Sequence, residues 1–469
     1  MSIITMKFGG TSVGSPEAIS NLVQIVREAR DAGDQVVVIV SAMAGTTDAL
    51  LRSITFAREG NRWSYRELSD KLRDKHEDAI NFLMDASPER ESIINEIRRL
   101  LDQHHDLCDA IAILGDATPR AIDHAVTFGE RMSSAMISAV LSAHGVPAQA
   151  FDAGQLLVTD DVHQNATPQW DATRANITER LIPQIEKGVV PVITGFIGAT
   201  PDGVYTTLGR GGSDYSAAIF AAYVNSDQFI VWTDVDGVMT TDPRIDKRAR
   251  VLSKVSYQEV GEMAFYGAKV LHPKTVQPIV NRGIPIWVRN TFNPTHPGTL
   301  ISHDSDDTGT VIKAVTAVRQ VSLLTVSGAG MLGVPGIAGR SFLATAGAGA
   351  NILMISQASS EQSFCFSVLQ HQAPQVKAAV EAELAEEIQQ NNVDGVHIRD
   401  DVSIVTVIGA GMRGIPGVAG RVFTRMGEQG ANVLAIAQGS SECSISFVVE
   451  ESIVRDAVIG LHDLALEAV

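Results

Sequence analysis

The sequence predicts an α/β protein, with a mostly parallel, helix-covered sheet in roughly the first 300 residues and two smaller units of strands and helices after it. Two observations support this prediction. Unbroken apolar runs rich in β-branched residues, such as residues 36–42, alternate with helical patterns, which is typical of strands buried on both faces. Residues 322–370 align without a gap with residues 403–451, and roughly half of the aligned positions are identical, so two copies of one unit follow each other.

Composition limits the function classes. With 469 residues the chain has room for roughly three domains. The net charge of −17 opposes nonspecific binding to nucleic acid, while a local basic pocket for an anionic ligand stays compatible with it. Cys108, Cys365 and Cys443 are widely spaced, so we expect packing residues rather than disulfides or a CxxC metal pair. No apolar run approaches the ~20 residues that span a bilayer, and no secretion signal precedes the first strand, so we expect a cytoplasmic protein.

The first part of the chain alternates strands and helices. Residues 3–8 are expected to form a strand and residues 16–32 a helix. Further buried strands are expected at residues 36–42, 189–196, 229–233 and 284–288. Residues 58–120 are rich in charge and in helix formers, and we interpret them as a helical insertion. His104 and His105 in this insertion lack a metal-binding spacing, so we expect them on a solvated helix face.

A turn-rich stretch separates the sheet from the repeats. Residues 291–309 have little apolar content, and we place the boundary there, with a first domain at residues 1–305. Each copy reads strand, glycine turn, helix, two strands and helix, which is the pattern of a ferredoxin-like fold, and the copies are expected at residues 311–400 and 401–469. The second copy ends without its fourth strand, and we hypothesise that a strand at residues 311–318 supplies it.

Both copies contain the pattern G-x-G-x-x-G between a strand and a helix. The glycines are Gly328, Gly330 and Gly333 in the first copy, and Gly409, Gly411 and Gly414 in the second. We reject a dinucleotide site, because no βαβ crossover and no ribose-binding acid follow. Two interpretations stay open: the turn presents a helix N-terminus to a small carboxylate ligand, or its glycines only permit close packing.

Polar residues at the ends of the predicted strands are the candidates for chemistry. Lys7 precedes Gly9 and Gly10, so its ammonium could meet a phosphate that the glycine backbone admits. A glycine-rich stretch at residues 206–218 contains Arg210, whose planar fork suits a carboxylate or a phosphate, and opens a helix of small residues. Phe128-Gly129-Glu130-Arg131 is expected to begin a helix, with Glu130 as a natural partner for an ammonium group. Phosphoryl transfer needs little beyond such positioning and charge stabilisation, although the Walker A sequence is missing.

Five motifs of the chain resemble the aspartate kinase family of the amino-acid kinase fold, and the tandem copies resemble its paired ACT domains. The motifs are Lys7-Phe8-Gly9-Gly10-Thr11-Ser12, Phe128-Gly129-Glu130-Arg131, Thr207-Leu208-Gly209-Arg210-Gly211-Gly212-Ser213-Asp214, Trp232-Thr233-Asp234-Val235-Asp236-Gly237 and Gly267-Ala268-Lys269-Val270-Leu271-His272-Pro273. The resemblance implies a three-layer amino-acid-kinase sandwich followed by two ACT domains of βαββαβ topology.

The resemblance also implies a reaction: transfer of the ATP γ-phosphate to the β-carboxylate of L-aspartate, which begins lysine, threonine and methionine synthesis. It implies that Lys7 neutralises the transferring phosphoryl group and that Asp214 orients Lys7. For aspartate it implies Arg210 at the α-carboxylate and Glu130 at the ammonium, with Ser41, Thr47 and Ser213 lining the pocket. For the nucleotide it implies Lys7, Gly9, Gly10, Thr233, Asp234, Asp236, Met239, Asp242, Arg244 and Lys269. Met239 departs from the tyrosine that is usual in the family, which leaves the base packing open. Mg²⁺ is expected to ride chiefly on the phosphates, without a dedicated protein site.

For regulation, the resemblance implies an amino-acid effector, with threonine favoured over lysine. Equivalent positions of the copies, Gln357 with Asn351 and Gln438 with Asn432, are the expected effector contacts; the alternative for the glutamines is a buried amide bonded to backbone. Pairing of ACT domains implies a homodimer or a dimer of dimers.

Three other functions compete with this assignment. A kinase for another amino acid, such as glutamate, would also read a zwitterion with Arg210 and Glu130, but the tandem sensor copies favour aspartate. The joint presence of Lys7, Arg210 and Asp214 speaks against a catalytically dead sensor. The kinase portion of a fused kinase and homoserine dehydrogenase is disfavoured, because no further domain follows the second copy.

Overall fold

The computed structural model describes residues 2–267, 271, 273–303, 311–357, 362–439 and 442–467. The chain divides into two compact units. The first comprises Met1–Val238, Ser253–Tyr257 and Val270–Asp304, and the second comprises Met239–Leu252, Gln258–Lys269 and Ser305–Val469. No helix among the described residues is both long and apolar enough to cross a membrane.

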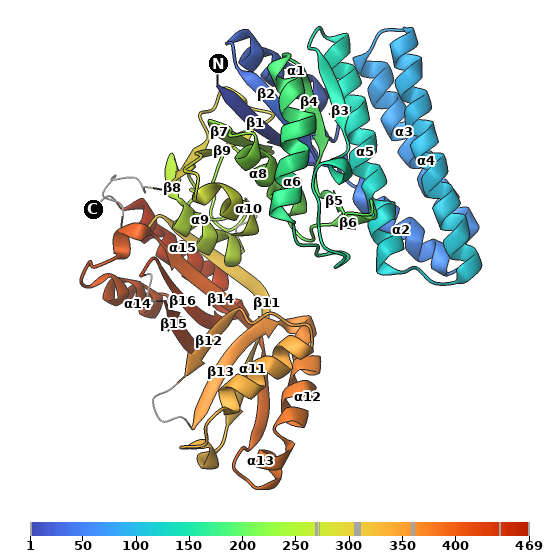
Figure 1. Ribbon diagram of the computed structural model, residues 1–469. Coiled ribbons are helices and arrows are strands. Elements are labelled where there is room, and N and C mark those ends of the chain that lie inside the picture. The colour runs from blue at the N-terminus through green and yellow to red at the C-terminus, as the bar shows by residue number, and fades with distance from the viewer. Residues whose placement is uncertain are drawn as a thin grey trace. The chain divides into compact units, whose positions relative to one another are not determined.

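The first unit is built on an eight-stranded sheet in the order β3-β4-β2-β1-β7-β9-β10-β8 (Figure 1). Its strands are β1 (Ile3–Phe8), β2 (Gln35–Val40), β3 (Ala148–Phe151), β4 (Val190–Thr194), β7 (Gln228–Thr233), β8 (Lys254–Ser256), β9 (Ile286–Asn290) and β10 (Thr299–Ser302). All pairs are parallel except β9 with β10. A separate hairpin joins β5 (Ile197–Ala199) to β6 (Tyr205–Thr207). The predicted mostly parallel α/β sheet is confirmed.

Helices cover both faces of this sheet (Figure 1). They are α1 (Pro16–Asp31), α2 (Thr46–Arg58), α3 (Arg62–Leu83), α4 (Pro88–Leu114), α5 (Pro119–Ala143), α6 (Trp170–Asn176), a π-helical turn (Ile177–Leu181), α7 (Ile182–Glu186), α8 (Gly212–Tyr223) and α10 (Pro273–Val280). Ile4, Met6 and Phe8 of β1 join the core formed with α1 and α5. Because side chains alternate along a strand, Thr5 and Lys7 face the opposite layer, where α8 packs against β1.

Two expectations for this unit are wrong. His104 is buried rather than solvated: only 1% of it is exposed, and Nε2 lies 3.0 Å from Ser53 Oγ. The motif around Glu130 lies in the middle of α5, which begins at Pro119 under the Thr118 N-cap. The burial of His104 depends on Ser53, far along the chain, which local composition does not reveal.

The second unit contains a six-stranded sheet in the order β12-β13-β11-β14-β16-β15 (Figure 1). Its elements are β11 (Ala314–Ser327), α11 (Ile337–Gly347), β12 (Met354–Gln357), β13 (Ser363–Leu369), α12 (Ala373–Glu383), α13 (Ala385–Gln389), β14 (Gly395–Ile408), α14 (Val418–Glu428), β15 (Ala435–Gln438), β16 (Ser444–Glu450) and α15 (Val454–Leu466). Helix α9 (Tyr257–Phe265) belongs to this unit from Gln258 onward.

Two long strands connect the copies of the second unit. Residues Ala314–Val318 of β11 pair with Ile404–Ile408 of β14, while the remainder of β11 pairs with β13 and with the first part of β14. The register shifts between Val318 and Val321. One apolar core gathers around α11 and α12, and another around α14 and α15. The predicted pair of ferredoxin-like units is confirmed.

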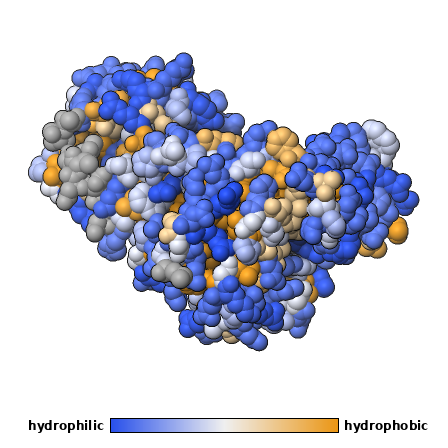
Figure 2. Space-filling model, turned by 90° about the horizontal axis from the view of Figure 1, so that it is seen from above, coloured by the Kyte–Doolittle hydropathy of each residue, from blue (hydrophilic) through white to orange (hydrophobic). Residues whose placement is uncertain are grey.

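The surface in Figure 2 is mostly hydrophilic, with hydrophobic residues in scattered groups between charged and polar ones. Such a surface is ordinary for a protein whose apolar residues fill cores on both sides of its sheets.

Candidate active site

The carboxyl ends of three adjacent strands meet at one edge of the first unit. β2, β1 and β7 are neighbours, and Phe8 pairs with both Val40 and Trp232. Gly9 and Ser41 therefore leave the sheet side by side, and Ser41 N donates to Phe8 O at 3.1 Å. Ligands of open α/β sheets bind at this edge. The topology thus places the predicted glycine and serine candidates at one site.

Lys7 is paired with Asp214 at this edge. Nζ lies 2.5 Å from Asp214 Oδ1, and the side chains are 10% and 18% exposed. Asp214 lies in the first turn of α8, which begins after Gly211 in the left-handed conformation. The backbone passes close to the ammonium, since a Cβ built on Gly9 would lie 3.6 Å from Nζ. A cation beside glycine backbone and a helix N-terminus can bind a phosphoryl group.

Glu130 presents a buried carboxylate without a full set of partners. It is 3% exposed, and its Oε2 has no hydrogen-bond partner among the described residues. Burial raises its pKa to about 8, against backbone hydrogen bonds that lower it, including one from Ala42. Gly129 allows α5 to pack closely against the loop after β2, because a Cβ at this position would lie 2.9 Å from Ala42 Cβ. A buried carboxyl group with a free oxygen is suited to a ligand cation.

Lys7, Glu130 and the glycine-rich stretch line one hollow of about 940 Å³. Its lining includes all of the residues predicted to contact aspartate, together with Lys7, Gly10 and Asp214: Ser41, Thr47, Glu130, Arg210 and Ser213. Arg210 is exposed and lies between Gly209 and Gly211, whose φ angles are 74° and 71°. The hollow therefore combines an ion pair, a buried carboxyl group and an exposed guanidinium.

Asp123 is a residue of this site that the sequence interpretation missed. It is 1% exposed, and it accepts hydrogen bonds from Thr207 Oγ1 at 2.7 Å and Gln164 N at 3.0 Å. His163 Nδ1 lies 2.7 Å from its Oδ2. Asp123 thus ties α5 to the strand that leads into the Arg210 turn. Its spacing of two helical turns before Glu130, on the same face of α5, is the signal that could have found it.

The acidic turn after β7 is held by amides. Asn290 Nδ2 donates to Asp236 Oδ1 at 2.8 Å and Asn293 Nδ2 donates to the same oxygen at 3.1 Å. Thr233 Oγ1 donates to Asp234 Oδ1 at 3.2 Å. The two asparagines were missed, because only folding brings residues 236 and 290 together. The other nucleotide candidates, Met239, Asp242 and Arg244, belong to the second unit, where an ion pair of 2.6 Å joins Asp242 to Arg244; Lys269 lies outside the described residues.

The described residues contain no group of three His, Cys, Asp or Glu side chains that could hold a metal ion. The charged groups at the site edge are the Lys7 ammonium and its partner Asp214, and the ammonium can contact nucleotide phosphates that carry their own Mg²⁺.

Comparison with known proteins agrees with this geometry. The model of the amino acid kinase family matches residues 2–290, and the ACT domain model matches residues 324–384 and 405–464. Aspartokinase 1, chloroplastic, of Arabidopsis thaliana is 30% identical over 472 residues, which cover 99% of this chain and 80% of that protein. The chain belongs to the aspartokinase family.

Longer relatives within the family carry a second enzyme. The bifunctional aspartokinase/homoserine dehydrogenase 1 of Zea mays is 37% identical over 451 residues, covering 95% of this chain and 48% of that protein. The chain thus spans about half the length of the bifunctional plant aspartokinases it matches. Among solved structures, E. coli aspartokinase III in complex with aspartate and ADP matches with a TM-score of 0.83 and 30% identity over 99% of this chain and 100% of that chain. The same enzyme in complex with lysine and aspartate matches with a TM-score of 0.79.

Within the two ACT copies, the glycine turns permit close packing, and the first turn also lines a hollow. A Cβ on Gly328 would lie 2.2 Å from Asn392 O, and one on Gly409 would lie 2.3 Å from Val311 O, so these glycines permit close packing. Further along the first turn, Gly336 precedes α11, and the turn lines a hollow of about 320 Å³ together with Gln357. Gln357 and Gln438 are both exposed, as are Asn351 and Asn432, which excludes the buried-amide alternative for the glutamines.

Proposed function

We propose that this aspartokinase homologue transfers the γ-phosphoryl group of ATP to the β-carboxylate of L-aspartate and produces 4-phospho-L-aspartate. The observation that carries the proposal is the joint placement of Glu130, Arg210 and the Lys7–Asp214 pair around one hollow. A zwitterionic substrate needs an anion for its ammonium and a cation for its α-carboxylate, and the incoming phosphoryl group needs a second cation. This site offers all three. The relatives named aspartokinase, and the E. coli enzyme with bound aspartate and ADP, support the same reaction.

In this proposal, Glu130 binds the α-ammonium of aspartate and Arg210 binds its α-carboxylate. Ser41, Thr47 and Ser213 complete the pocket wall with short polar side chains. Because the α-ammonium and the α-carboxylate are both bound, the β-carboxylate is the group of aspartate that remains to receive the phosphoryl group beside Lys7. Fixing the substrate in this way supplies most of what phosphoryl transfer requires, because the reaction depends on positioning and charge stabilisation.

Lys7 then binds the transferring phosphoryl oxygens, and Asp214 keeps the ammonium directed at them. Gly9 and Gly10 let the phosphates approach the backbone. Mg²⁺ bound to the phosphates would neutralise part of their charge. Thr233, Asp234 and Asp236 at the end of β7, with Met239, Asp242, Arg244 and Lys269 further along the chain, are proposed to hold the nucleotide.

The pH dependence of aspartate use tests the role of Glu130. Burial raises its pKa to about 8, so the carboxyl is mostly protonated at pH 7 and must lose its proton before it can pair with an ammonium. We expect kcat/KM for aspartate to rise by several-fold up to about tenfold between pH 7 and pH 8 at saturating MgATP. KM for ATP should change much less over this range. A value of kcat/KM for aspartate that is flat from pH 6.5 to 8.5 would contradict the role.

Incubation with MgATP, L-aspartate and hydroxylamine tests the reaction itself. An acyl phosphate formed on aspartate is trapped as its hydroxamate, which is measured by its coloured iron complex. We expect hydroxamate with aspartate and none with glutamate. Product from glutamate alone would overturn the assignment, and no product from either would favour a binding protein.

We further propose that residues 1–305 form the catalytic domain and that the ACT copies, at residues 311–400 and 401–469, sense an amino-acid effector. Threonine is the favoured effector, and its proposed contacts are Gln357, Asn351, Gln438 and Asn432. The proposed pathway is lysine, threonine and methionine synthesis, and the proposed assembly is a dimer or a dimer of dimers in the cytoplasm. The hollow beside Gln357 is large enough for an amino acid and lies at a helix N-terminus, where a carboxylate binds well.

Substitution of the two glutamines tests this sensor. We expect Gln357→Ala and Gln438→Ala each to raise the effector concentration for half-inhibition by about three- to tenfold, the scale of one or two lost hydrogen bonds. Turnover without effector should stay normal. Gln390→Ala, an exposed glutamine of the same unit, is the control. Unchanged inhibition by both threonine and lysine in both variants would contradict the site.

A further inference from the structure

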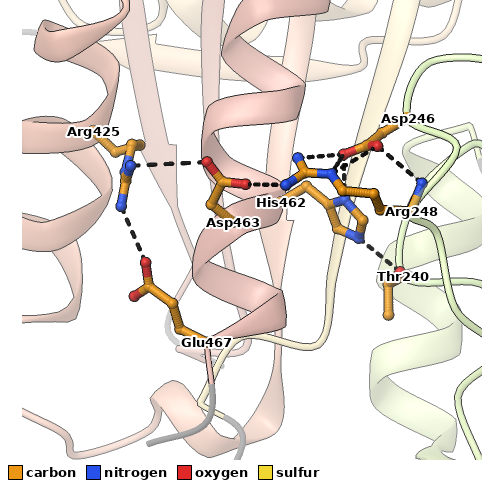
Figure 3. A network of polar contacts seen from close by, with 7 residues as sticks. All are labelled: Thr240, Asp246, Arg248, Arg425, His462, Asp463 and Glu467. Carbon is orange, nitrogen blue, oxygen red and sulfur yellow. Dashed lines mark hydrogen bonds and ion pairs between the residues drawn. The ribbon is translucent and has the colours of Figure 1, made fainter.

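Helix α15 is bonded to the segment 239–252 through a buried histidine. His462 is fully buried, and its two ring nitrogens reach two different residues of that segment (Figure 3). Nδ1 lies 2.8 Å from Asp246 Oδ2, and Nε2 lies 2.8 Å from Thr240 Oγ1. All three residues belong to the second unit. One side chain of the second ACT copy therefore holds two points of a segment that lies within the family match of the kinase.

The hydrogen-bond partners of His462 indicate which of its ring nitrogens carries a hydrogen. The Asp246 carboxylate can only accept, so Nδ1 carries a hydrogen. Thr240 Oγ1 accepts from Arg250 N at 3.0 Å, which leaves its own hydroxyl hydrogen for His462 Nε2. A neutral imidazole satisfies both partners at once. Loss of either partner would leave a ring nitrogen buried without a hydrogen bond, which is costly.

A second link runs parallel to the first. Arg248 Nη2 donates to Asp246 Oδ2 at 2.7 Å, and Arg248 Nη1 lies 2.8 Å from Asp463 Oδ1 (Figure 3). The guanidinium lowers the pKa of Asp246 far below its usual range, so this carboxylate stays charged. The other carboxylate oxygen of Asp463, Oδ2, lies 3.8 Å from Nη1 of Arg425 in α14. The segment is thus connected through two adjacent residues of α15 to the core of the second copy.

Backbone hydrogen bonds of Thr240 also connect the two ends of the segment 239–252 and attach the segment to β11. Thr240 N donates to Arg250 O at 2.9 Å, and Val315 N of β11 donates to Thr240 O at 2.8 Å. Asp242 and Arg244 lie between Thr240 and Asp246 in the chain. The carbonyl of Asp242 accepts from the backbone N–H groups of Ile245, at 2.9 Å, and Asp246, at 3.1 Å. The backbone between the two anchor points of His462 is therefore a short, internally bonded turn.

We propose that His462 is a positioning residue for the nucleotide-binding segment: by fixing Thr240 and Asp246, it sets the conformation in which Asp242 and Arg244 meet ATP. This inference rests on the proposed function, which assigns Asp242 and Arg244 to the nucleotide. Its consequence is that helix α15 of the second ACT copy controls the affinity for nucleotide and not that for aspartate.

Two substitutions test the proposal in the full-length protein. Thr240→Val keeps the size of the side chain and removes its hydroxyl, while His462→Asn keeps a donor for Asp246 and no longer reaches Thr240. We expect each to raise the Kd for MgADP in calorimetry and the KM for ATP by about three- to tenfold, with KM for aspartate changed by less than about twofold. Thr240→Ser should restore normal values. The double variant should resemble Thr240→Val, because that substitution already removes the bond to His462, together with the one from Arg250 N.

His76→Asn is the matched control. His76 is another fully buried histidine, bonded to Leu72 O in α3, so the substitution should lower the thermal midpoint without changing MgADP affinity. The proposal is overturned if Thr240→Val and His462→Asn bind MgADP as tightly as the wild type, or if their KM values for ATP and aspartate rise by the same factor. Since MgADP binding needs no turnover, a failure of the proposed reaction would show separately, as wild-type protein that binds MgADP and yields no hydroxamate.

Discussion

Replacement of Lys7 by alanine is expected to reduce kcat about a hundred- to thousandfold, the effect of losing one preorganised charge at the transferring group, or roughly 3 kcal/mol. The ammonium lies 2.5 Å from Asp214 Oδ1 and is largely shielded from water, so water screens its attraction for a phosphoryl group only weakly. KM for aspartate should change little, because Glu130 and Arg210 bind that substrate. Steady-state kinetics in the hydroxamate assay measures both constants.

Folding of the Lys7→Ala variant must be checked by thermal unfolding, because removal of Lys7 leaves Asp214 without its ion-pair partner. Lys7→Ala/Asp214→Ala removes both charges and should be as inactive as Lys7→Ala while unfolding closer to the wild type. Lys187→Ala, at an exposed position beyond α7, should behave as the wild type in both assays. Turnover within about threefold of normal in a folded Lys7→Ala protein would refute the role of this lysine.

Replacement of Glu130 by glutamine is expected to act in opposite directions on function and stability. The pKa of Glu130 is raised to about 8 in the folded protein, from an ordinary value of 4.5. The folded state therefore holds this proton more tightly than the unfolded chain, and the resulting stability is complete below pH 4.5 and is lost as pH rises through 8. Glutamine carries no ionisable group, so at pH 8 the variant should gain free energy of unfolding on the order of a few kcal/mol.

The same substitution should lower kcat/KM for aspartate by about two to three orders of magnitude, because a charged partner of the substrate ammonium is lost. KM for ATP should stay close to normal. Calorimetric unfolding at pH 5.5 and pH 8 checks the stability gain, which should be larger at the higher pH. Glu186→Gln, at an exposed position, is the control and should show neither effect. An equal gain at both pH values would contradict the raised pKa, and normal use of aspartate would contradict the binding role.

The sequence predicts most of the architecture because the dominant signals are local. Apolar runs such as Val36–Val40 are typical of strands buried on both faces, and they appear as β2 and its neighbours. The alternation of side chains along β1 then directs Lys7 to the α8 layer, where Asp214 lies. The repeat between residues 322 and 451 predicts two similar units, and the structure contains two similar halves of one sheet.

What the sequence could not predict depends on partners far along the chain. His104 has the flanking charges of a solvated position, yet Ser53 and Phe128 enclose it. Asp123 belongs to no motif, and its importance appears only when Thr207 and Gln164 fold against it. The same holds for His462, which bonds residues more than 200 positions earlier in the chain. Such networks follow from tertiary packing rather than from local patterns.

The regiochemistry of the trapped product tests the central claim most directly. If Glu130 and Arg210 bind the two α-groups of aspartate, only the β-carboxylate can reach the phosphoryl group beside Lys7. We therefore predict that the product of MgATP, L-aspartate and hydroxylamine, compared by NMR with the two authentic standards, is the β-hydroxamate alone. The α-hydroxamate, or no aspartate hydroxamate from folded protein that binds MgADP, would contradict the account.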